Sequence, residues 1–324
     1  MIVSNTRMQS PSRKSSMHER NIHRDGYDMA ALCGAFPALS QFIVTSQAGT
    51  PTINFTDPSA VMALNQAILI HLYGVEDWNL PEGYLCPPVP GRADYIHHVA
   101  DLLAASNRGA IPEGISTRVL DIGVGANVIY PIVGRKSYGW SFTGSDIDER
   151  ALLSASEIIG RNELLQEYVN LKLQKNASHF FKGVVGNEDE FDLVVCNPPF
   201  YANEAEASEA ASRKWKNLGK SKDMGNKRNF GGHTNELYCE GGELQFIRKM
   251  IEESFFFARR CYWFTTLVSK QEHMHQLHRT LQKIKATDVK VIHMSQGQKS
   301  SRILAWTLLH PDQQREWRAR HFWE

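Results

Sequence analysis

One ten-residue stretch, 191–200, restricts the possible folds of this 324-residue chain more than any other. It reads Phe-Asp-Leu-Val-Val-Cys-Asn-Pro-Pro-Phe, an apolar, strand-forming run followed by an amide, two prolines and an aromatic ring. Proline cannot donate to a sheet ladder, so the strand must end at Asn197, and Pro198 and Pro199 stiffen the path beyond it. Asn197 and Phe200 are therefore expected just beyond a strand tip, where open α/β sheets bind ligands.

This arrangement suits chemistry on the exocyclic amine of a nucleobase, which is a poor nucleophile because its lone pair is delocalised into the ring. The side-chain oxygen of Asn197 and the carbonyl of Pro198 can accept its two hydrogens and draw the nitrogen towards tetrahedral geometry. Phe200 offers a face on which a flipped or single-stranded base can stack. A plain strand and a proline-rich turn with a core phenylalanine explain the same residues, so a second motif must decide.

That second motif lies upstream, where a predicted strand ends in Asp121-Ile122-Gly123-Val124-Gly125. Glycines let the backbone turn tightly and approach a ligand closely. The third glycine of the dinucleotide fingerprint is replaced by Val128, which argues against a pyrophosphate cofactor. Asp121 instead suits a cationic amino-acid group, although such a turn can also be purely structural.

Further polar groups follow the next two predicted strands. Asp146 lies about 20 residues beyond the glycines, the usual place of a carboxylate that holds ribose hydroxyls, with helix capping as the alternative role. Asn176 stands at the tip of the third strand, where an adenine ring would be bound. In a doubly wound sheet the strands that carry Asp121 and Asn197 are neighbours, so both side chains would face one pocket. This geometry favours methyl transfer.

The order of elements predicts an α/β fold in which a mostly parallel seven-stranded sheet is flanked by helices. Residues 1–18 are expected to be a disordered tail, 19–110 a small helical subdomain and 111–324 the sheet domain. The last strand is expected to run antiparallel. The predicted strands are 116–122, 139–144, 169–173, 193–196, 261–268, 289–294 and 303–309.

Composition narrows the functional classes. The net charge is +1, so a nucleic-acid partner must be held by local basic groups. The five cysteines are scattered without a Cys-x-x-Cys pair, and no apolar run approaches the roughly 20 residues that span a bilayer. A cytoplasmic protein is therefore expected. His273, His275 and His278 lack the carboxylate or cysteine that would complete a metal site.

Near the N-terminus, Arg20, His23 and Arg24 lie close to Tyr27. This mix suits phosphate contacts and base stacking, although a solvated arm explains it more simply.

Residues 201–238 lack a regular pattern and follow directly after Phe200. The basic residues of this segment that could contact phosphates are Arg213, Lys214, Lys216, Lys220, Lys227 and Arg228. The segment is expected to be a loop that grips a substrate through its phosphates, with a solvated charge run as the alternative.

Together these motifs resemble a known family. Asp121 to Gly125 with Asn197-Pro198-Pro199-Phe200 is similar to the class I S-adenosylmethionine-dependent amino-group methyltransferases, which have a Rossmann-like fold. More narrowly, residues 54–58, 87–96 and 240–243 resemble the bacterial 23S rRNA adenine-N6 methyltransferase F family. That family is named for modifying adenine 1618, and it has a eukaryotic relative acting on U6 and messenger RNA hairpins.

The resemblance implies S-adenosylmethionine as the cofactor, contacted by Arg92, Gly123, Asp146, Asn176 and Asn197, with Arg92 on its carboxylate. From its position alone, after three prolines and a glycine, Arg92 could reach a carboxylate at the sheet edge or be a surface charge. The implied product is N6-methyladenosine in 23S rRNA or in a large-subunit assembly intermediate. The resemblance further implies that the N-terminal arm and the basic segment hold RNA. A monomer without a membrane or metal partner is expected.

Two other functions stay open. Protein glutamine N5-methyltransferases also use Asn-Pro-Pro, though typically followed by tyrosine, where this chain has Phe200. A non-catalytic RNA-binding module with a degenerate fold is opposed by the intact glycines and by Asn197.

Overall fold

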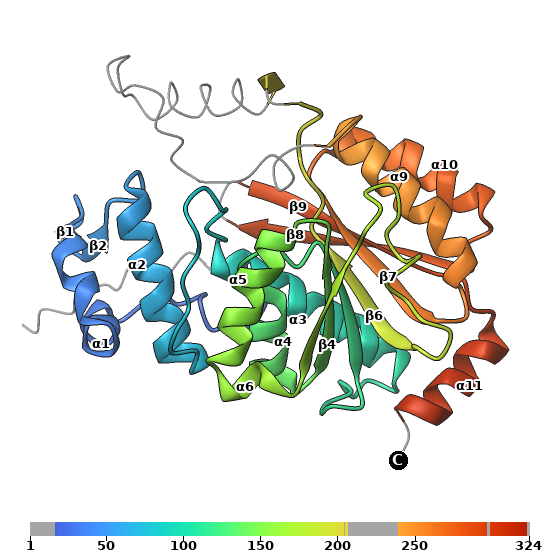
Figure 1. Cartoon of the computed structure of the whole chain (residues 1–324), viewed down its shortest axis with the longest axis horizontal. Coiled ribbons are helices and arrows are strands. Elements are labelled where there is room, and N and C mark those ends of the chain that lie inside the picture. Colours follow the sequence, from blue (N-terminus) through green and yellow to red (C-terminus); the bar gives the residue numbers. More distant parts are fainter. Residues whose placement is uncertain (1–16, 204, 207–238, 297–298, 323–324) are drawn as a thin grey trace, which may run out of the picture.

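The computed structural model describes residues 17–203, 205–206, 239–296 and 299–322. A central sheet runs through the molecule with helices packed against it, and the N-terminal helices lie at one end (Figure 1). The sheet strands are β3 (Arg118–Ile122), β4 (Ser141–Asp146), β5 (Val169–Leu173), β6 (Phe191–Cys196), β7 (Cys261–Val268), β8 (Asp288–Gln296) and β9 (Lys299–Thr307).

The helices divide between the N-terminal segment and the two faces of the sheet. The α-helices are α1 (Met29–Ala35), α2 (Pro58–Ile68), α3 (Val89–Ser106), α4 (Ile129–Tyr138), α5 (Glu149–Gly160), α6 (Glu163–Gln166), α9 (Gly242–Ser254), α10 (Met274–Lys283) and α11 (Pro311–His321). Shorter turns are η1 (Pro37–Phe42), the π-helical η2 (Leu69–Tyr73), η3 (Phe255–Phe257) and η4 (Gln271–His273). None of these helices is long and apolar enough to cross a membrane.

The seven strands follow the order β5-β4-β3-β6-β7-β9-β8. The first five run parallel, and β9 is antiparallel to both of its neighbours. The mostly parallel seven-stranded sheet and its antiparallel last strand are thus confirmed. The strand order reverses between β3 and β6, which are paired with Asp121 opposite Val195 and Ile122 opposite Cys196. Asn197 therefore follows directly at the switch point, where ligands bind in open α/β sheets.

Both faces of the sheet are buried, as is usual for parallel strands. Adjacent residues of β3 point into different clusters: Val119 packs with α3, α4 and α5, whereas Leu120 packs with α9 and α10. The first cluster also contains Leu32 and Leu64 from the N-terminal helices, so the two segments of the chain share one core. The division at residue 110 stays a prediction.

The N-terminal segment differs from the expected pattern in two places. A small hairpin of β1 (Ile43–Thr45) and β2 (Pro51–Ile53) appears where no strand was predicted, because strands this short show no periodicity. Helix α3 begins at Val89, so Arg92 lies in its first turn and is 8% exposed. The alternative of a surface charge is therefore wrong for Arg92.

Candidate active site

The turn after β3 uses the left-handed backbone region three times. Gly123 and Gly125 have φ values of 74° and 66°, and Val128 has a φ of 46° at the start of α4. A β-branched residue adopts this region only under strain, and such strain gathers at functional sites. A Cβ on Gly123 would have no heavy atom within 4 Å, so the turn borders open space.

Asp121 is 1% exposed, and neither of its carboxylate oxygens has a hydrogen-bond partner among the described residues. Burial raises the pKa of this carboxyl well above its usual range; nearby Asp146 raises it further, and Arg92 opposes the shift. A buried carboxylate without a partner is costly and uncommon. Its position beside the glycine turn fits a site that binds a positively charged group.

Asp146 is the last residue of β4 and holds the glycine turn in place. One carboxylate oxygen accepts from the backbone of Gly125 at 2.9 Å, and the other accepts from Asp148 N at 3.0 Å. Asp148 itself caps α5 by accepting from Arg150 N at 2.9 Å. The ribose role of Asp146 stays a prediction.

Arg92 reaches the site from α3. Its guanidinium donates to the hydroxyl of Tyr130 at 2.9 Å and lies 5.6 Å from the centre of that ring. Tyr130 is 4% exposed, and burial raises its pKa. Sequence reasoning missed Tyr130, since nothing except its place just after the glycine turn sets it apart from a core tyrosine.

Asn197 is half-buried at the end of β6, and its Oδ1 atom is buried without a hydrogen-bond partner among the described residues. Just below it, the hydroxyl of Tyr95 accepts from Cys196 N at 3.3 Å and lies 2.8 Å from Oγ1 of Thr265. Thr265 uses its only proton on the carbonyl of Val194 at 2.7 Å, so Tyr95 donates to Thr265. This network fixes the backbone that carries Asn197, and sequence reasoning missed it.

Phe200 is half-buried and lies beside the base of the predicted basic loop. The carbonyl of Tyr201 accepts from Cys239 N at 3.1 Å, and Gly242 approaches the backbone of Ala202 so closely that a Cβ there would lie 3.3 Å from the Ala202 nitrogen. The two ends of the predicted basic loop, residues 201–238, therefore meet next to Phe200.

The interior of that segment, residues 207–238, lies outside the described residues. The six predicted RNA contacts from Arg213 to Arg228 fall within it and stay predictions.

Asn176 stands near the tip of β5 in a tight turn. Its side-chain oxygen accepts from Ser178 N at 2.9 Å, and its own backbone nitrogen donates to Oε1 of Gln174 at 3.0 Å. The predicted contact of Asn176 with an adenine ring stays a prediction.

The N-terminal arm packs on α3 instead of extending as a free strand. Arg20 donates to Asp101 at 2.6 Å, and His23 is 4% exposed, with its ring nitrogens 2.7 Å from Tyr73 OH and 2.9 Å from Tyr27 OH. Burial lowers the pKa of His23 to about 4, so its ring is neutral at pH 7. A direct contact between this ring and RNA would require the side chain to leave its present site.

His18 marks the start of the arm, not the end of a tail. It is 8% exposed, its backbone nitrogen donates to Asp94 at 2.7 Å, and its ring lies 2.8 Å from Asp101. The predicted tail boundary at residue 18 is therefore wrong for His18 itself. Arg24 donates to the carbonyl of Glu19 at 3.1 Å.

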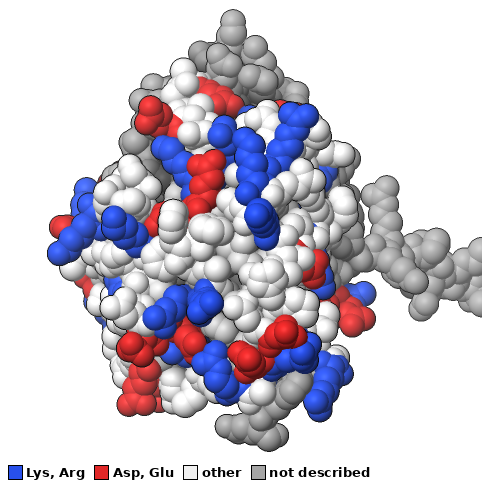
Figure 2. All heavy atoms as spheres, turned by 90° about the vertical axis from the view of Figure 1, so that its right-hand side faces the viewer, with Lys and Arg blue, Asp and Glu red and all other residues white. Residues whose placement is uncertain are grey.

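Charge on the molecular surface is mixed where it can be seen. Figure 2 shows the face that carries α9, α10 and α11, with small groups of Lys and Arg separated by Asp and Glu. Among the described residues, no group of three or more His, Cys, Asp and Glu could hold a metal ion.

The strand order and the two polar strand tips define a class I methyltransferase, whose methyl donor is S-adenosylmethionine. A family model described as RNA methyltransferase matches residues 11–310. Ribosomal RNA large subunit methyltransferase F of Shewanella pealeana is 50% identical over 329 residues, covering 94% of this chain and 87% of the relative. The Serratia proteamaculans protein of the same name is 48% identical over 311 residues, covering 95% of this chain and 92% of the relative. The chain belongs to the ribosomal RNA large subunit methyltransferase F family of RNA methyltransferases.

Solved structures agree with this assignment. The human METTL16 catalytic domain in complex with MAT2A 3′UTR hairpin 1 is 28% identical with a TM-score of 0.74, covering 92% of this chain and 97% of that one. The N-terminal domain of human METTL16 in complex with SAH is 26% identical with a TM-score of 0.72, covering 91% of this chain and 99% of that one. The expected family and the expected methyl donor are thereby confirmed.

Proposed function

We propose that this protein methylates the N6 amine of one adenine in 23S rRNA, with adenine 1618 as the expected nucleotide. The observation that carries the proposal is the pair of unpartnered buried oxygens at adjacent strand tips, on Asp121 at β3 and on Asn197 at β6. One suits a cationic donor and the other suits an amine to be methylated. The relatives named for ribosomal RNA support the substrate class.

The residues around the glycine turn fit S-adenosylmethionine, which supplies an electrophilic methyl group on its sulfonium when it is bound. Asp121 would hold its ammonium group, and Arg92 would hold its carboxylate through the guanidinium positions left beside Tyr130. Asp146 would accept from the ribose, and Asn176 would bind the adenine ring. The open space beside Gly123 leaves room for this approach.

Asn197 and Pro198 would hold the substrate amine. The Asn197 carboxamide oxygen has no partner among the residues that the structure describes, so it is free to accept one amine hydrogen, and the Pro198 carbonyl can accept the other. Accepting both hydrogens localises the nitrogen lone pair, which is the electron pair that must attack. Phe200 would stack on the ring and fix its plane.

Two titratable groups lie near Asn197: the Cys196 thiol, next to it in the sequence, and the Tyr95 hydroxyl, in the hydrogen-bond network beneath it. Neither acts as a base at neutral pH. Burial raises the pKa of the adjacent Cys196 thiol and of the Tyr95 hydroxyl, so both are protonated. No base is needed before attack, because the amine proton becomes acidic only after charge develops on the nitrogen. Catalysis here would rest on positioning and electrostatics.

RNA would be held by Arg20 and Arg24 in the N-terminal arm and by the basic residues of the 201–238 segment. The support for this proposal is its placement, since the ends of that segment meet beside Phe200. His23 would act indirectly, by packing the arm between Tyr27 and Tyr73.

The test is to map N6-methyladenosine in 23S rRNA from a strain that lacks the gene, complemented with the wild-type chain, with Asn197→Ala or with Asn170→Ala. Asn170 is an exposed residue of β5 and serves as the matched control. We expect one modified adenine to disappear in the deletion strain and to return with the wild type and with the control only. An unchanged map would refute the proposal, and label from tritiated S-adenosylmethionine entering only protein would favour the glutamine methyltransferase.

A further inference from the structure

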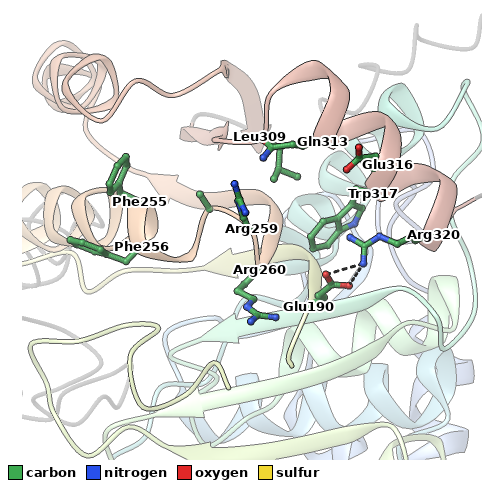
Figure 3. A pocket seen from close by; sticks show the side chains of 11 residues that line it. Glu190, Phe255, Phe256, Arg259, Arg260, Leu309, Gln313, Glu316, Trp317 and Arg320 are labelled. Atoms are coloured by element: carbon green, nitrogen blue, oxygen red, sulfur yellow. Dashed lines mark hydrogen bonds and ion pairs between the residues drawn. The ribbon is translucent and has the colours of Figure 1, made fainter. Parts of the chain in front are cut away.

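A cavity of about 860 Å³ lies at the amino ends of β6 and β7, at the opposite end of β6 from Asn197. It lies between α11 and the turn that joins α9 to β7 (Figure 3). Its wall on one side is formed by Phe255, Phe256, Arg259 and Arg260, which we name the amino-edge surface. We propose that this surface binds a second, single-stranded segment of the substrate RNA, remote from the target adenine. The inference rests on the proposed function, which makes a large RNA the substrate.

The two phenylalanines are unusual for a surface. Phe255 is 53% exposed and Phe256 is 80% exposed, although α9, which ends at Ser254, buries one of its faces. Their ring centres lie 5.7 Å apart with the planes at 84°, so each ring keeps a face that the other does not cover. Exposed aromatic faces of this kind stack on unpaired bases of any sequence.

The two arginines supply charge that the protein does not use. Neither the Arg259 nor the Arg260 side chain makes a hydrogen bond or ion pair within the described part of the chain. The cavity contains three arginines and two glutamates, and Glu190 is already paired with Arg320 at 2.9 Å. Figure 3 shows Arg259 and Arg260 between the phenylalanine pair and this ion pair. A local surplus of positive charge is therefore available for phosphates.

The backbone of the amino-edge surface is held in place before any ligand binds. Arg260 N donates to Phe257 O at 2.9 Å, and Arg260 O accepts from Phe191 N at 2.8 Å, at the start of β6. Presentation on a fixed turn lowers the ordering cost of binding. Two exposed aromatic rings beside two arginines suit a single-stranded nucleic acid, because it offers a base to each ring and a phosphate to each guanidinium.

The distance from the active site fits a second contact and excludes the target base itself. Six residues of β6 separate Glu190 from Asn197, which is about 20 Å at the rise of a strand. A ribosomal RNA can follow the protein over such a distance, whereas one flipped nucleotide cannot. The amino-edge surface would thus set affinity for the large substrate without touching the reacting atoms.

The binding test uses the full chain and a short fluorescein-labelled oligouridylate, which lacks the base amine that Asn197 would hold. Phe255→Ala with Phe256→Ala forms one variant, and Arg259→Glu with Arg260→Glu forms another. Matched controls are Phe55→Ala, at a side chain 61% exposed elsewhere, and Arg248→Glu on the exposed face of α9.

We expect each double variant to bind the probe about tenfold more weakly, because it can no longer stack on the bases or neutralise the phosphates. The slope of log affinity against log salt should fall by about 0.7 for each phosphate that the arginine variant fails to neutralise. The KM for 23S rRNA from the deletion strain should rise severalfold, with kcat unchanged. The two controls should behave like the wild type.

A photoreactive benzophenone amino acid in place of Phe256 identifies the partner directly. Crosslinks to a 23S segment away from the methylated adenine support the inference, and crosslinks confined to a ribosomal protein overturn it. The inference is also overturned if both double variants keep the wild-type probe affinity and salt slope. The proposed function still stands in that case, provided that the variants methylate 23S rRNA. Failure of the wild type to methylate 23S rRNA would instead defeat the proposed function, whatever the probe does.

Discussion

The hydroxyl of Tyr95 on α3 lies 2.8 Å from Oγ1 of Thr265 on β7, and between them these two groups hold the end of β6. Tyr95 also accepts from Cys196 N, and Thr265 donates to the Val194 carbonyl at 2.7 Å. Two strands and one helix are thus tied together directly beneath Asn197. The position of the Asn197 side chain depends on a bond between residues that are 170 positions apart.

The substitution Tyr95→Phe should therefore affect turnover more than cofactor binding. Removing the hydroxyl leaves Cys196 N without its partner, which costs about 1–2 kcal/mol of the free energy of unfolding. We expect kcat to fall about tenfold because the amide shifts from its productive position. The affinity for S-adenosylmethionine, measured by calorimetry, should change little.

The matched control for this prediction is Tyr262→Phe. Tyr262 is equally buried, and its hydroxyl accepts from Arg318 at 3.0 Å at the start of β7, far from Asn197. If both variants lowered the melting temperature and kcat to the same extent, the effect of Tyr95 would be merely structural. The role of the Tyr95 hydroxyl would gain support if no residue other than tyrosine at position 95 gave the wild-type kcat.

Asn197→Ala removes the oxygen that would accept the substrate amine. We expect kcat to fall by about 100-fold or more, the usual result of deleting one transition-state hydrogen bond. S-Adenosylmethionine should bind within a fewfold of the wild type, since Asp121 and Arg92 remain. Single-turnover methylation of 23S rRNA measures the first quantity and calorimetry the second, and full methylation at the wild-type rate would remove Asn197 from the mechanism.

Asp121→Asn should separate stability from function. The buried carboxylate has no partner among the described residues, so its neutral isostere removes an uncompensated charge from the interior. Because the folded pKa is raised, the stabilisation that this group contributes is present below the unfolded pKa near 3.8 and is lost as the pH rises. At pH 7.5 the free energy of unfolding of the variant should exceed that of the wild type by about 1–3 kcal/mol in urea titrations.

The same variant should bind S-adenosylmethionine at least about tenfold more weakly, because a full negative charge facing the ammonium group is removed. Leu153→Gln, at an exposed position 66% accessible on α5, is a control that changes neither quantity. A variant that lost stability and kept its cofactor affinity would show that Asp121 is a structural residue.

The outline of the site could be predicted because its signals are local. A proline such as Pro198 ends a central strand in any fold, and Gly123 marks a turn that needs a positive φ. Both strand tips can therefore be identified from neighbouring residues. Their meeting in space then follows from the handedness and order of parallel sheets, which confine β3 and β6 to adjacent positions.

The supporting contacts could not be predicted, because they depend on packing between distant elements. Nothing local distinguishes Tyr95, which reaches β6 and β7, from other apolar residues of its helix. Composition also suggested that the His23 side chain faces solvent, whereas its ring is buried and hydrogen-bonded to the hydroxyls of Tyr27 and Tyr73. A polar residue near a basic arm has the same sequence signature whether it points to solvent or inward.

His321, near the C-terminal end of α11, should make stability depend on pH. Its ring lies 3.0 Å from Glu190 and 3.3 Å from Asp192, a buried carboxylate that also accepts from Trp317 at 2.7 Å. Burial alone would lower the pKa of His321, but the hydrogen bonds and charges of Asp192 and Glu190 outweigh it and raise the pKa above 6.5.

A raised folded pKa means that this stabilisation is fully present below the unfolded pKa of about 6.5 and is lost as the pH rises through the folded value. The free energy of unfolding by which the wild type exceeds His321→Asn should therefore fall by about 1 kcal/mol between pH 6 and pH 8.5 in urea titrations, because buried histidines such as His23, whose pKa is lowered, contribute equally to both proteins. His71→Asn, at an exposed residue of η2, should keep the pH dependence of the wild type. Parallel slopes in all three proteins would mean that α11 is held on the sheet by Trp317 and not by the charged ring.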